Sequence, residues 1–342
     1  MRRSRFKYMI CFLLLIGACH QSEEALPMVT TMPDLMEIPS GFPAIEFPDD
    51  NSFTKARWDL GKKLFFDPVM SIDSSLSCAS CHQPNLAFSD DQAFSIGVDE
   101  QLGTRNSPSL ANVAYHPYFT REGGVATLEM QVLVPIQEHD EFNFNIVLIA
   151  ERLAQDSVYI ELSKAAYDRP PDHFVITRAI ACFERSLLSG FSRYDQFENG
   201  TFPEILNTQE QNGKALFFSE RTKCAHCHGG FNFTNYAFEN NGLYQSYPDP
   251  GRFRLTNEAS DRALFKVPSL RNIELTAPYM HDGSINSLEE VIDHYQTGGE
   301  LHPNKSALIQ PLDLNDQEKA ALVAFLKTLT DAHFINNPLF KF

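Results

Sequence analysis

The sequence predicts a mostly α-helical protein made of two tandem domains of the same kind, with long loops between the helices. The pentapeptide Cys-x-x-Cys-His occurs twice, at 78–82 and at 224–228. The phrase Gly-Lys-x-Leu-Phe-Phe precedes each copy, at 61–66 and at 213–218. Strand signals are sparse, and stretches rich in Gly, Pro, Asn and Asp separate the helical segments. A repeated motif with a repeated preceding helix indicates a duplicated unit.

Each pentapeptide is typical of a site where two cysteines form thioethers to a haem and the adjoining histidine ligates the iron. We therefore expect two c-type haems. The four cysteines could instead form one zinc site, but that reading leaves both histidines without a role. The expected haem-binding residues are Cys78, Cys81 and His82 in the first motif and Cys224, Cys227 and His228 in the second.

The other cysteines need no disulfide framework. Cys182 lies in 174–188, where apolar residues recur at helical spacing, so we expect a buried and inert thiol. Cys11 and Cys19 lie near the start of the chain.

The first residues predict export. Four basic residues precede an apolar run at 9–16, and Ile16-Gly17-Ala18-Cys19 is similar to a bacterial lipobox. We expect a lipoprotein signal peptide at 1–18, cleaved before Cys19, and a lipid on the Cys19 sulfur. A plain signal peptide cut nearby is the alternative. Either places the protein on the periplasmic side of the cell envelope, and the lipid would anchor it to a membrane.

The charge of the chain argues against nucleic acid as a partner. The formal net charge is −16, and loss of residues 1–18, which hold four basic and no acidic residues, makes it −20. Such a surface could steer a basic electron donor toward the protein, or it could serve solubility alone.

The exported part divides into a Pro-rich tether at 19–46, a first haem domain at 47–200 and a second at 201–342, with the boundary near Gly200 and Pro203. Capping-box spacings, Ser-x-x-Glu and Asn-x-x-Glu, predict helices that start at Leu288 and at Asp316.

The chain resembles the bacterial dihaem cytochrome c peroxidases and their relative MauG from about Trp58 to Thr328. The resemblance implies two cytochrome c-like domains, and reduction of hydrogen peroxide with electrons from a small exported cytochrome c or copper protein. A MauG-like oxidase and a dihaem electron carrier without turnover are alternatives. Members are often dimers, so a homodimer is possible. The phrases that carry the resemblance are 64–68, 105–110, 128–131, 267–272 and 276–283.

The resemblance implies that the first haem reduces peroxide. Gln131 and Glu141 match the distal residues of the family, with Glu141 as the proton shuttle. The spacing from Gln131 through Pro135 selects Glu141 over Glu138, although a glutamate in so acidic a run is most often a solvated charge. These two residues argue against a carrier without turnover.

Two departures from the family pattern are informative. Val98 stands where many members have a histidine that closes the oxidised first haem, so we expect an open site that needs no reductive activation. His116 is the nearest substitute and is read as a structural or surface residue. Arg121 stands ten residues before Gln131, where the family has a relay tryptophan. Electron transfer would then lack an aromatic relay or use Phe119 and the haem propionates, and Arg121 could pair with a propionate.

The upper ligand of the second haem is Tyr295 or Met280. Tyr295 falls where ordinary peroxidases have methionine and MauG has a ligating tyrosine. An anionic oxygen would lower the reduction potential, whereas a thioether raises it. Tyr295 also shares a helical face with Leu288 and Ile292, so a core position is the alternative.

The resemblance further implies a calcium ion between the domains. The matching positions are Asn106, Thr276 and Pro278, and oxygen ligands of this kind suit a hard cation. An ordinary turn role for Asn106 is the alternative.

Overall fold

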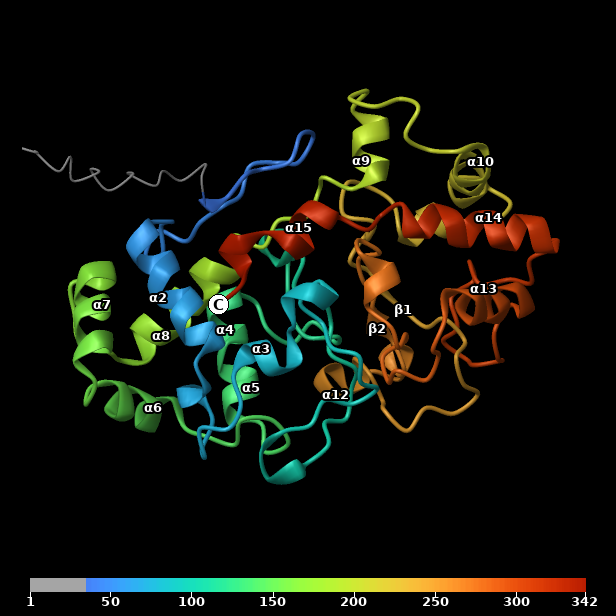
Figure 1. The fold of residues 1–342 in the computed structure, drawn as a ribbon. Helices are drawn as coiled ribbons and strands as arrows, with labels where there is room; N and C mark the ends of the chain where they lie inside the picture. The colour runs from blue at the N-terminus through green and yellow to red at the C-terminus, as the bar shows by residue number, and fades with distance from the viewer. Residues whose placement is uncertain (1–34) are drawn as a thin grey trace, which may run out of the picture. The chain divides into compact units, whose positions relative to one another are not determined.

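Helices supply nearly all regular structure in the computed structural model, which describes residues 35–342 (Figure 1). The expected signal peptide, Cys11 and Cys19 lie outside these residues. The only named strands in the described part are β1 (Phe238–Glu239) and β2 (Phe265–Lys266), which pair antiparallel. The mostly α prediction is therefore confirmed. The helices are α2 (Lys55–Phe66), α3 (Cys78–Cys81), α4 (Leu128–Gln131), α5 (Leu133–Gln137), α6 (Ile146–Leu153), α7 (Ser157–Tyr167), α8 (His173–Glu184), α9 (Arg193–Glu198), α10 (Thr208–Phe217), α11 (Cys224–Cys227), α12 (Phe253–Thr256), α13 (Leu288–Thr297), α14 (Asp316–Lys327) and α15 (Ala332–Asn336).

The predicted helix starts are confirmed. Ser287 caps α13 and Asn315 caps α14, each in a complete capping box with the glutamate three residues on. Cys182 is 1% exposed within α8, and burial raises the pKa of its thiol to about 11, as expected for an inert cysteine. Within residues 35–342 no helix is long and apolar enough to span a bilayer.

The repeated glycine of the Gly-Lys-x-Leu-Phe-Phe phrase lets two helices cross closely in each domain. α2 packs on α8, and α10 packs on α14 (Figure 1). A Cβ on Gly61 would lie 1.9 Å from the backbone oxygen of Ala179, and one on Gly213 would lie 1.9 Å from that of Ala321. The same clash in both domains explains why this glycine belongs to the repeat.

Replacing Gly61 with alanine should therefore destabilise the fold by about 1–3 kcal/mol, the usual cost of overpacking. Helix propensity alone would predict the opposite, a gain of about 1 kcal/mol. Urea unfolding followed by circular dichroism measures the change. Gly103→Ala is the matched control, because its Cβ would meet nothing closer than 3.5 Å. Equal stability of the two variants would contradict the close crossing.

Aromatic rings fill a separate core in each domain. Phe65 and Phe183 lie 5.1 Å apart at the α2–α8 crossing, and Phe217 and Phe325 lie 5.1 Å apart at the α10–α14 crossing. Cys78 packs against the first core and Cys224 against the second. Each helix pair therefore forms a wall beside one Cys-x-x-Cys-His motif.

Three segments depart from the expected domain bounds of 19–46, 47–200 and 201–342. Tyr194 of α9, assigned to the first domain, contacts the ring of Phe325 in the second core. Phe334 and Phe340, at the C-terminal end, belong to the first core. Residues 35–46, expected in a tether, are not a free linker, because Leu35 is only 3% exposed within the first core. These segments carry apolar side chains, and burial against either core removes such side chains from water. A segment can therefore pack in a core other than the one expected from its place in the chain.

Candidate haem and peroxide site

The two motif histidines have the same arrangement in both domains. His82 Nδ1 lies 2.9 Å from the carbonyl oxygen of Phe88. His228 Nδ1 lies 3.2 Å from that of Phe233 and 3.1 Å from that of Pro268. Carbonyl oxygens only accept, so each Nδ1 carries the proton and donates it. Each Nε2 is then the ring nitrogen left to ligate a metal.

Burial keeps both imidazoles neutral. It lowers the pKa of His82 and lowers the pKa of His228 to about 4, against a smaller opposing effect of the carbonyl hydrogen bonds. Neutral imidazole is the form that binds iron. With two cysteines on the preceding helical turn in each domain, the donor set fits two c-type haems.

Gln131 ends α4, which Thr127 caps at its other end. Its side-chain oxygen is buried and has no hydrogen-bond partner among the described residues. Buried polar atoms without partners are uncommon in folded proteins and call for a specific explanation. The side-chain oxygen of Gln131 can therefore accept a hydrogen bond from a bound ligand.

The loop that carries Val98 packs directly on the loop that carries Glu141. The Val98 N–H donates to the carbonyl oxygen of Glu141 at 3.0 Å. Gly97 permits this approach, because a Cβ there would lie 2.0 Å from the carbonyl oxygen of Asp140. Val98 is 2% exposed, so an aliphatic side chain that cannot bind metal fills this position.

The carboxyl of Glu141 has a raised pKa. Burial by the surrounding protein raises the pKa of its carboxyl to about 7, and the neighbouring charges of Glu138 and Asp140 add to the effect. The residue is nevertheless exposed to solvent. The Glu141 charge also contributes to the raised pKa of the Cys78 and Cys81 thiols, so the carboxyl lies within electrostatic range of the first motif. A carboxyl of this kind can exchange protons near neutral pH.

Both candidate ligands of the second haem lie beside Asn241. The Met280 sulfur accepts from Asn241 Nδ2 at 3.2 Å. Burial raises the pKa of Tyr295, while a hydrogen bond with the Asn241 side chain lowers it and the Cys224 and Cys227 charges raise it. Tyr295 therefore lies within electrostatic range of the second motif. The sequence did not point to Asn241, because it stands far along the chain from both partners.

Glu184 is a second residue near a haem motif that the sequence patterns did not indicate. It ends α8 and is only 9% exposed. Burial raises the pKa of its carboxyl to about 8, and after burial its charge is the largest cause of the raised pKa of Cys78. The sequence did contain a signal for this residue, because Glu184 is a charged residue within the apolar helical segment 174–188.

His116 is half-buried and not a surface residue. Its Nε2 is buried without a hydrogen-bond partner among the described residues, and its ring lies 5.2 Å from that of Tyr236. Burial lowers its pKa to about 3. Trp58 is likewise a core residue, 4% exposed, and donates from Nε1 to Ser186.

Asn106, expected to bind calcium, lies against the guanidinium of Arg121. Its backbone N–H donates to His281 O at 2.9 Å, which ties it to the segment that follows Thr276 and Pro278. However, its side-chain and backbone oxygens both accept from Arg121. Of the three expected calcium ligands, Asn106 is therefore the one whose side-chain oxygen already contacts a cationic side chain of this chain.

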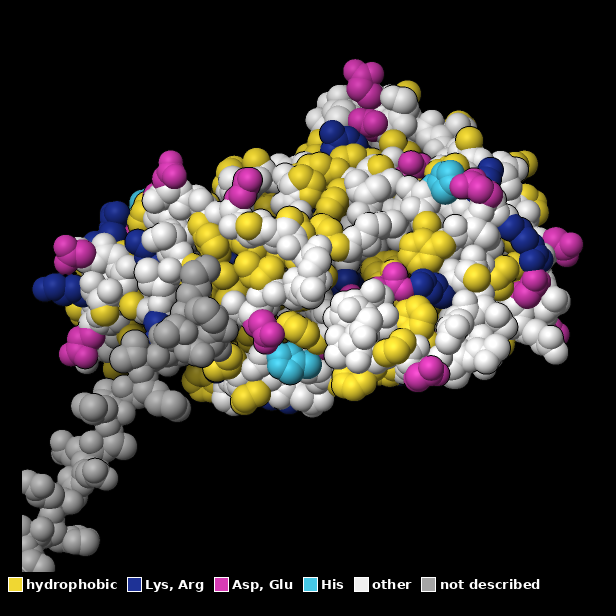
Figure 2. Space-filling model, turned by 90° about the horizontal axis from the view of Figure 1, so that it is seen from above, with side chains coloured by type: hydrophobic (Ala, Val, Ile, Leu, Met, Phe, Trp, Pro, Cys, Tyr) yellow, Lys and Arg dark blue, Asp and Glu magenta, His cyan; other side chains and the backbone are white. Residues whose placement is uncertain are grey.

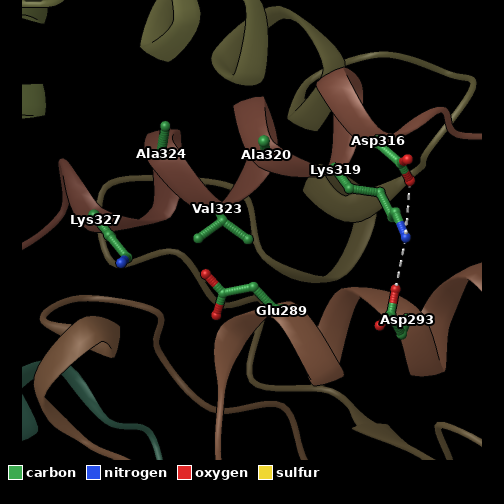
Figure 3. A pocket seen from close by; sticks show the side chains of 8 residues that line it. All are labelled: Glu289, Asp293, Asp316, Lys319, Ala320, Val323, Ala324 and Lys327. Atoms are coloured by element: carbon green, nitrogen blue, oxygen red, sulfur yellow. Dashed lines mark hydrogen bonds and ion pairs between the residues drawn. The ribbon is translucent and has the colours of Figure 1, made fainter.

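The groove between α13 and α14 is not part of this site. Figure 3 shows that its side chains come from these two helices. Lys319 pairs across it with Asp293 at 3.0 Å and lies 3.5 Å from Asp316. No expected haem or metal ligand lines the groove.

Two tandem domains, each with a Cys-x-x-Cys-His motif against its own aromatic core, define a dihaem protein of the cytochrome c class. A family model of di-haem cytochrome c peroxidases matches residues 55–202, and a cytochrome c model matches 210–330. The chain belongs to the family of dihaem cytochrome c peroxidases and MauG proteins.

Known proteins of both kinds are similar to this chain. The methylamine utilization protein MauG of Methylorubrum extorquens is 36% identical over 289 residues, which cover 84% of this chain and 81% of that protein. The cytochrome c551 peroxidase of Nitrosomonas europaea is 34% identical over 279 residues, covering 80% and 79%. The crystal structure of a MauG-like protein associated with microbial copper homeostasis aligns with a TM-score of 0.85 and 37% identity, covering 89% and 97%. The protein is an oxidoreductase of this family.

Proposed function

We propose that the protein reduces hydrogen peroxide to water at its first haem, with electrons relayed through the second haem from a small exported cytochrome c or copper protein. The observation that supports the proposal is the backbone contact between Val98 and Glu141, which puts the expected proton shuttle next to a buried side chain that cannot bind iron.

The protein residues have separate tasks in this reaction. The haem, when bound, supplies the iron and the electrons that cleave the O–O bond. Glu141 accepts a proton from the inner peroxide oxygen and returns it to the outer one, which makes water the leaving group. The Gln131 amide hydrogen-bonds the peroxide and orients it. His82 would hold the haem iron through its Nε2.

The resting protein should accept peroxide without prior reduction, because Val98 offers no ligand to close the first site. Electron paramagnetic resonance and optical spectra of the oxidised holoprotein, before and after peroxide, test this expectation. We expect a high-spin ferric signal that peroxide consumes. Two low-spin haems that respond only after partial reduction would show that another residue closes the site. A Val98→His variant is the matched comparison and should acquire the low-spin, inactive resting form.

A MauG-like oxidase is the second candidate. In this reading peroxide withdraws electrons from a protein or organic substrate instead of a small redox donor. The observation that favours it is Tyr295 beside the second motif, since phenolate ligation stabilises oxidised iron. Steady-state peroxide consumption with reduced cytochrome c as the sole donor distinguishes the two, because the second candidate predicts little turnover.

Export and attachment to the envelope are part of the proposal. The motif ending at Cys19 supports lipidation and a periplasmic position. Mass spectrometry of the N-terminal peptide from the membrane fraction tests this. On the face in Figure 2 acidic side chains are scattered among basic ones and form no single large patch. Sedimentation would establish whether the chain forms the homodimer that the family suggests.

A further inference from the structure

We propose that the guanidinium of Arg121 takes the place of the expected interdomain calcium ion, so that a built-in organic cation replaces the metal. The inference is independent of the proposed reaction, because it concerns only how the chain satisfies Asn106 and the charges around it.

One guanidinium engages both oxygens that Asn106 offers. Arg121 Nη2 donates to the backbone oxygen at 2.6 Å and to Oδ1 at 3.1 Å, and Nε donates to the backbone oxygen at 3.3 Å. Side-chain amide and backbone oxygens are the ligands that calcium uses. A calcium ion at Asn106 Oδ1 would have to displace Arg121 or lie within a few ångströms of its charge.

Arg121 is charged at neutral pH. Burial and then the charge of Arg105 lower its pKa to about 10, against the opposing effects of Asp282, Asp249 and Glu122. The group thus keeps its proton under all ordinary conditions. Among the described residues, no carboxylate lies within salt-bridge distance of Arg121, since Glu122 and Asp249 pair with Arg105 instead. The side-chain hydrogen bonds of Arg121 in this part of the chain go to Asn106 alone.

Two of the three carboxylates whose charges act on Arg121 are already paired with Arg105. Arg105 pairs with Asp249 at 2.6 Å and also with Glu122. The Lys266 N–H donates to the Arg121 carbonyl oxygen at 2.6 Å, which brings a third basic residue to this region. The charges of Arg105 and Lys266 act on Arg121, or Arg121 on them, as like charges that disfavour a further cation.

The described residues offer no carboxylate cluster as a different cation site. In residues 35–342 no group of three or more His, Cys, Asp or Glu side chains is arranged to hold a metal ion. Arg121 stands at the position that the family fills with tryptophan, so one substitution brings a permanent cation to the Asn106 oxygens.

Calcium content of the full-length holoprotein tests the proposal directly. The protein is equilibrated with calcium, dialysed against calcium-free buffer and measured by elemental analysis, and its melting temperature is recorded with calcium and with EGTA. We expect substoichiometric calcium and no shift of the melting temperature or the haem spectrum. Tightly held calcium at about one ion per chain, or a melting temperature lowered by EGTA, would overturn the proposal.

Arg121→Gln removes the charge and should create calcium binding, seen as a melting temperature that rises with calcium concentration. Arg121→Lys keeps a charge and should remain insensitive. Arg254→Gln is the matched control, because Arg254 is a neighbouring arginine whose side chain is 51% exposed and 3.8 Å from Glu122. Calcium insensitivity of a folded Arg121→Gln protein, or equal calcium binding by Arg254→Gln, would contradict the exclusion of calcium by Arg121.

Discussion

Replacing Glu141 with glutamine should lower the turnover of hydrogen peroxide by about 10²–10⁴-fold, the usual contribution of a positioned acid–base group. Glutamine keeps the size and polarity of the side chain but cannot carry the proton between the two peroxide oxygens. The Val98 contact should survive, because it uses the Glu141 backbone oxygen. Steady-state peroxide consumption with a reduced cytochrome c measures the loss.

The pH profile gives an independent test of the same residue. The raised pKa of Glu141, about 7, means that the carboxyl is largely protonated below this pH and cannot accept a proton. We therefore expect kcat/KM of the natural protein to fall as pH drops through about 7. The Glu141→Gln variant should lack this limb of the profile.

Glu138→Gln is the matched control for both measurements. Glu138 lies in the same acidic run, is exposed, and contributes to the pKa of Glu141. Its replacement should shift the pH profile slightly toward acid and leave the maximal rate nearly unchanged. A Glu138 variant as inactive as the Glu141 variant, or an active Glu141→Gln protein, would show that the proton carrier has been assigned to the wrong residue.

Tyr295→Met should raise the reduction potential of the second haem by on the order of 100 mV, because a neutral thioether replaces an oxygen donor that stabilises ferric iron. Under the MauG-like alternative the variant loses its oxidation of a protein or organic substrate. Under the peroxidase proposal it still reduces peroxide with a small donor. Potentiometric titration followed optically measures the change.

Met280→Leu is the control for this exchange. Met280 and Tyr295 both reach Asn241, so either could lie on the upper side of the second haem. If Tyr295 is the ligand, Met280→Leu leaves the low-spin spectrum of that haem unchanged. If only Met280→Leu changes the spectrum, Met280 is the ligand and the tyrosine is a core residue of α13.

Local patterns predicted the helical elements well. The capping boxes at Ser287 and Asn315 and the apolar spacing around Cys182 are each contained in a short window of sequence, and the structure confirms them. The repeated Gly61 and Gly213 were visible as a pattern, but their reason lies in the carbonyls of Ala179 and Ala321. That reason became visible only when the partner helices were placed.

Chain segments that cross between the cores were not predictable from composition. The C-terminal Phe334 packs in the first core, and the apolar Leu35 does the same from the other end of the described chain. A sequence window shows that such residues are apolar and not which core will bury them, because the burial free energy depends on area and not on the identity of the partner.

The sequence by itself determined the haem attachment motifs, the duplicated helical architecture and the family, because each rests on residues close together in the chain. Only the tertiary structure showed Val98 against the Glu141 backbone, Asn241 between Met280 and Tyr295, and Arg121 on the oxygens of Asn106. These contacts join residues from separate loops, and their hydrogen bonds and charges act over a few ångströms of space. Sequence spacing carries no information about such distances until the fold has formed.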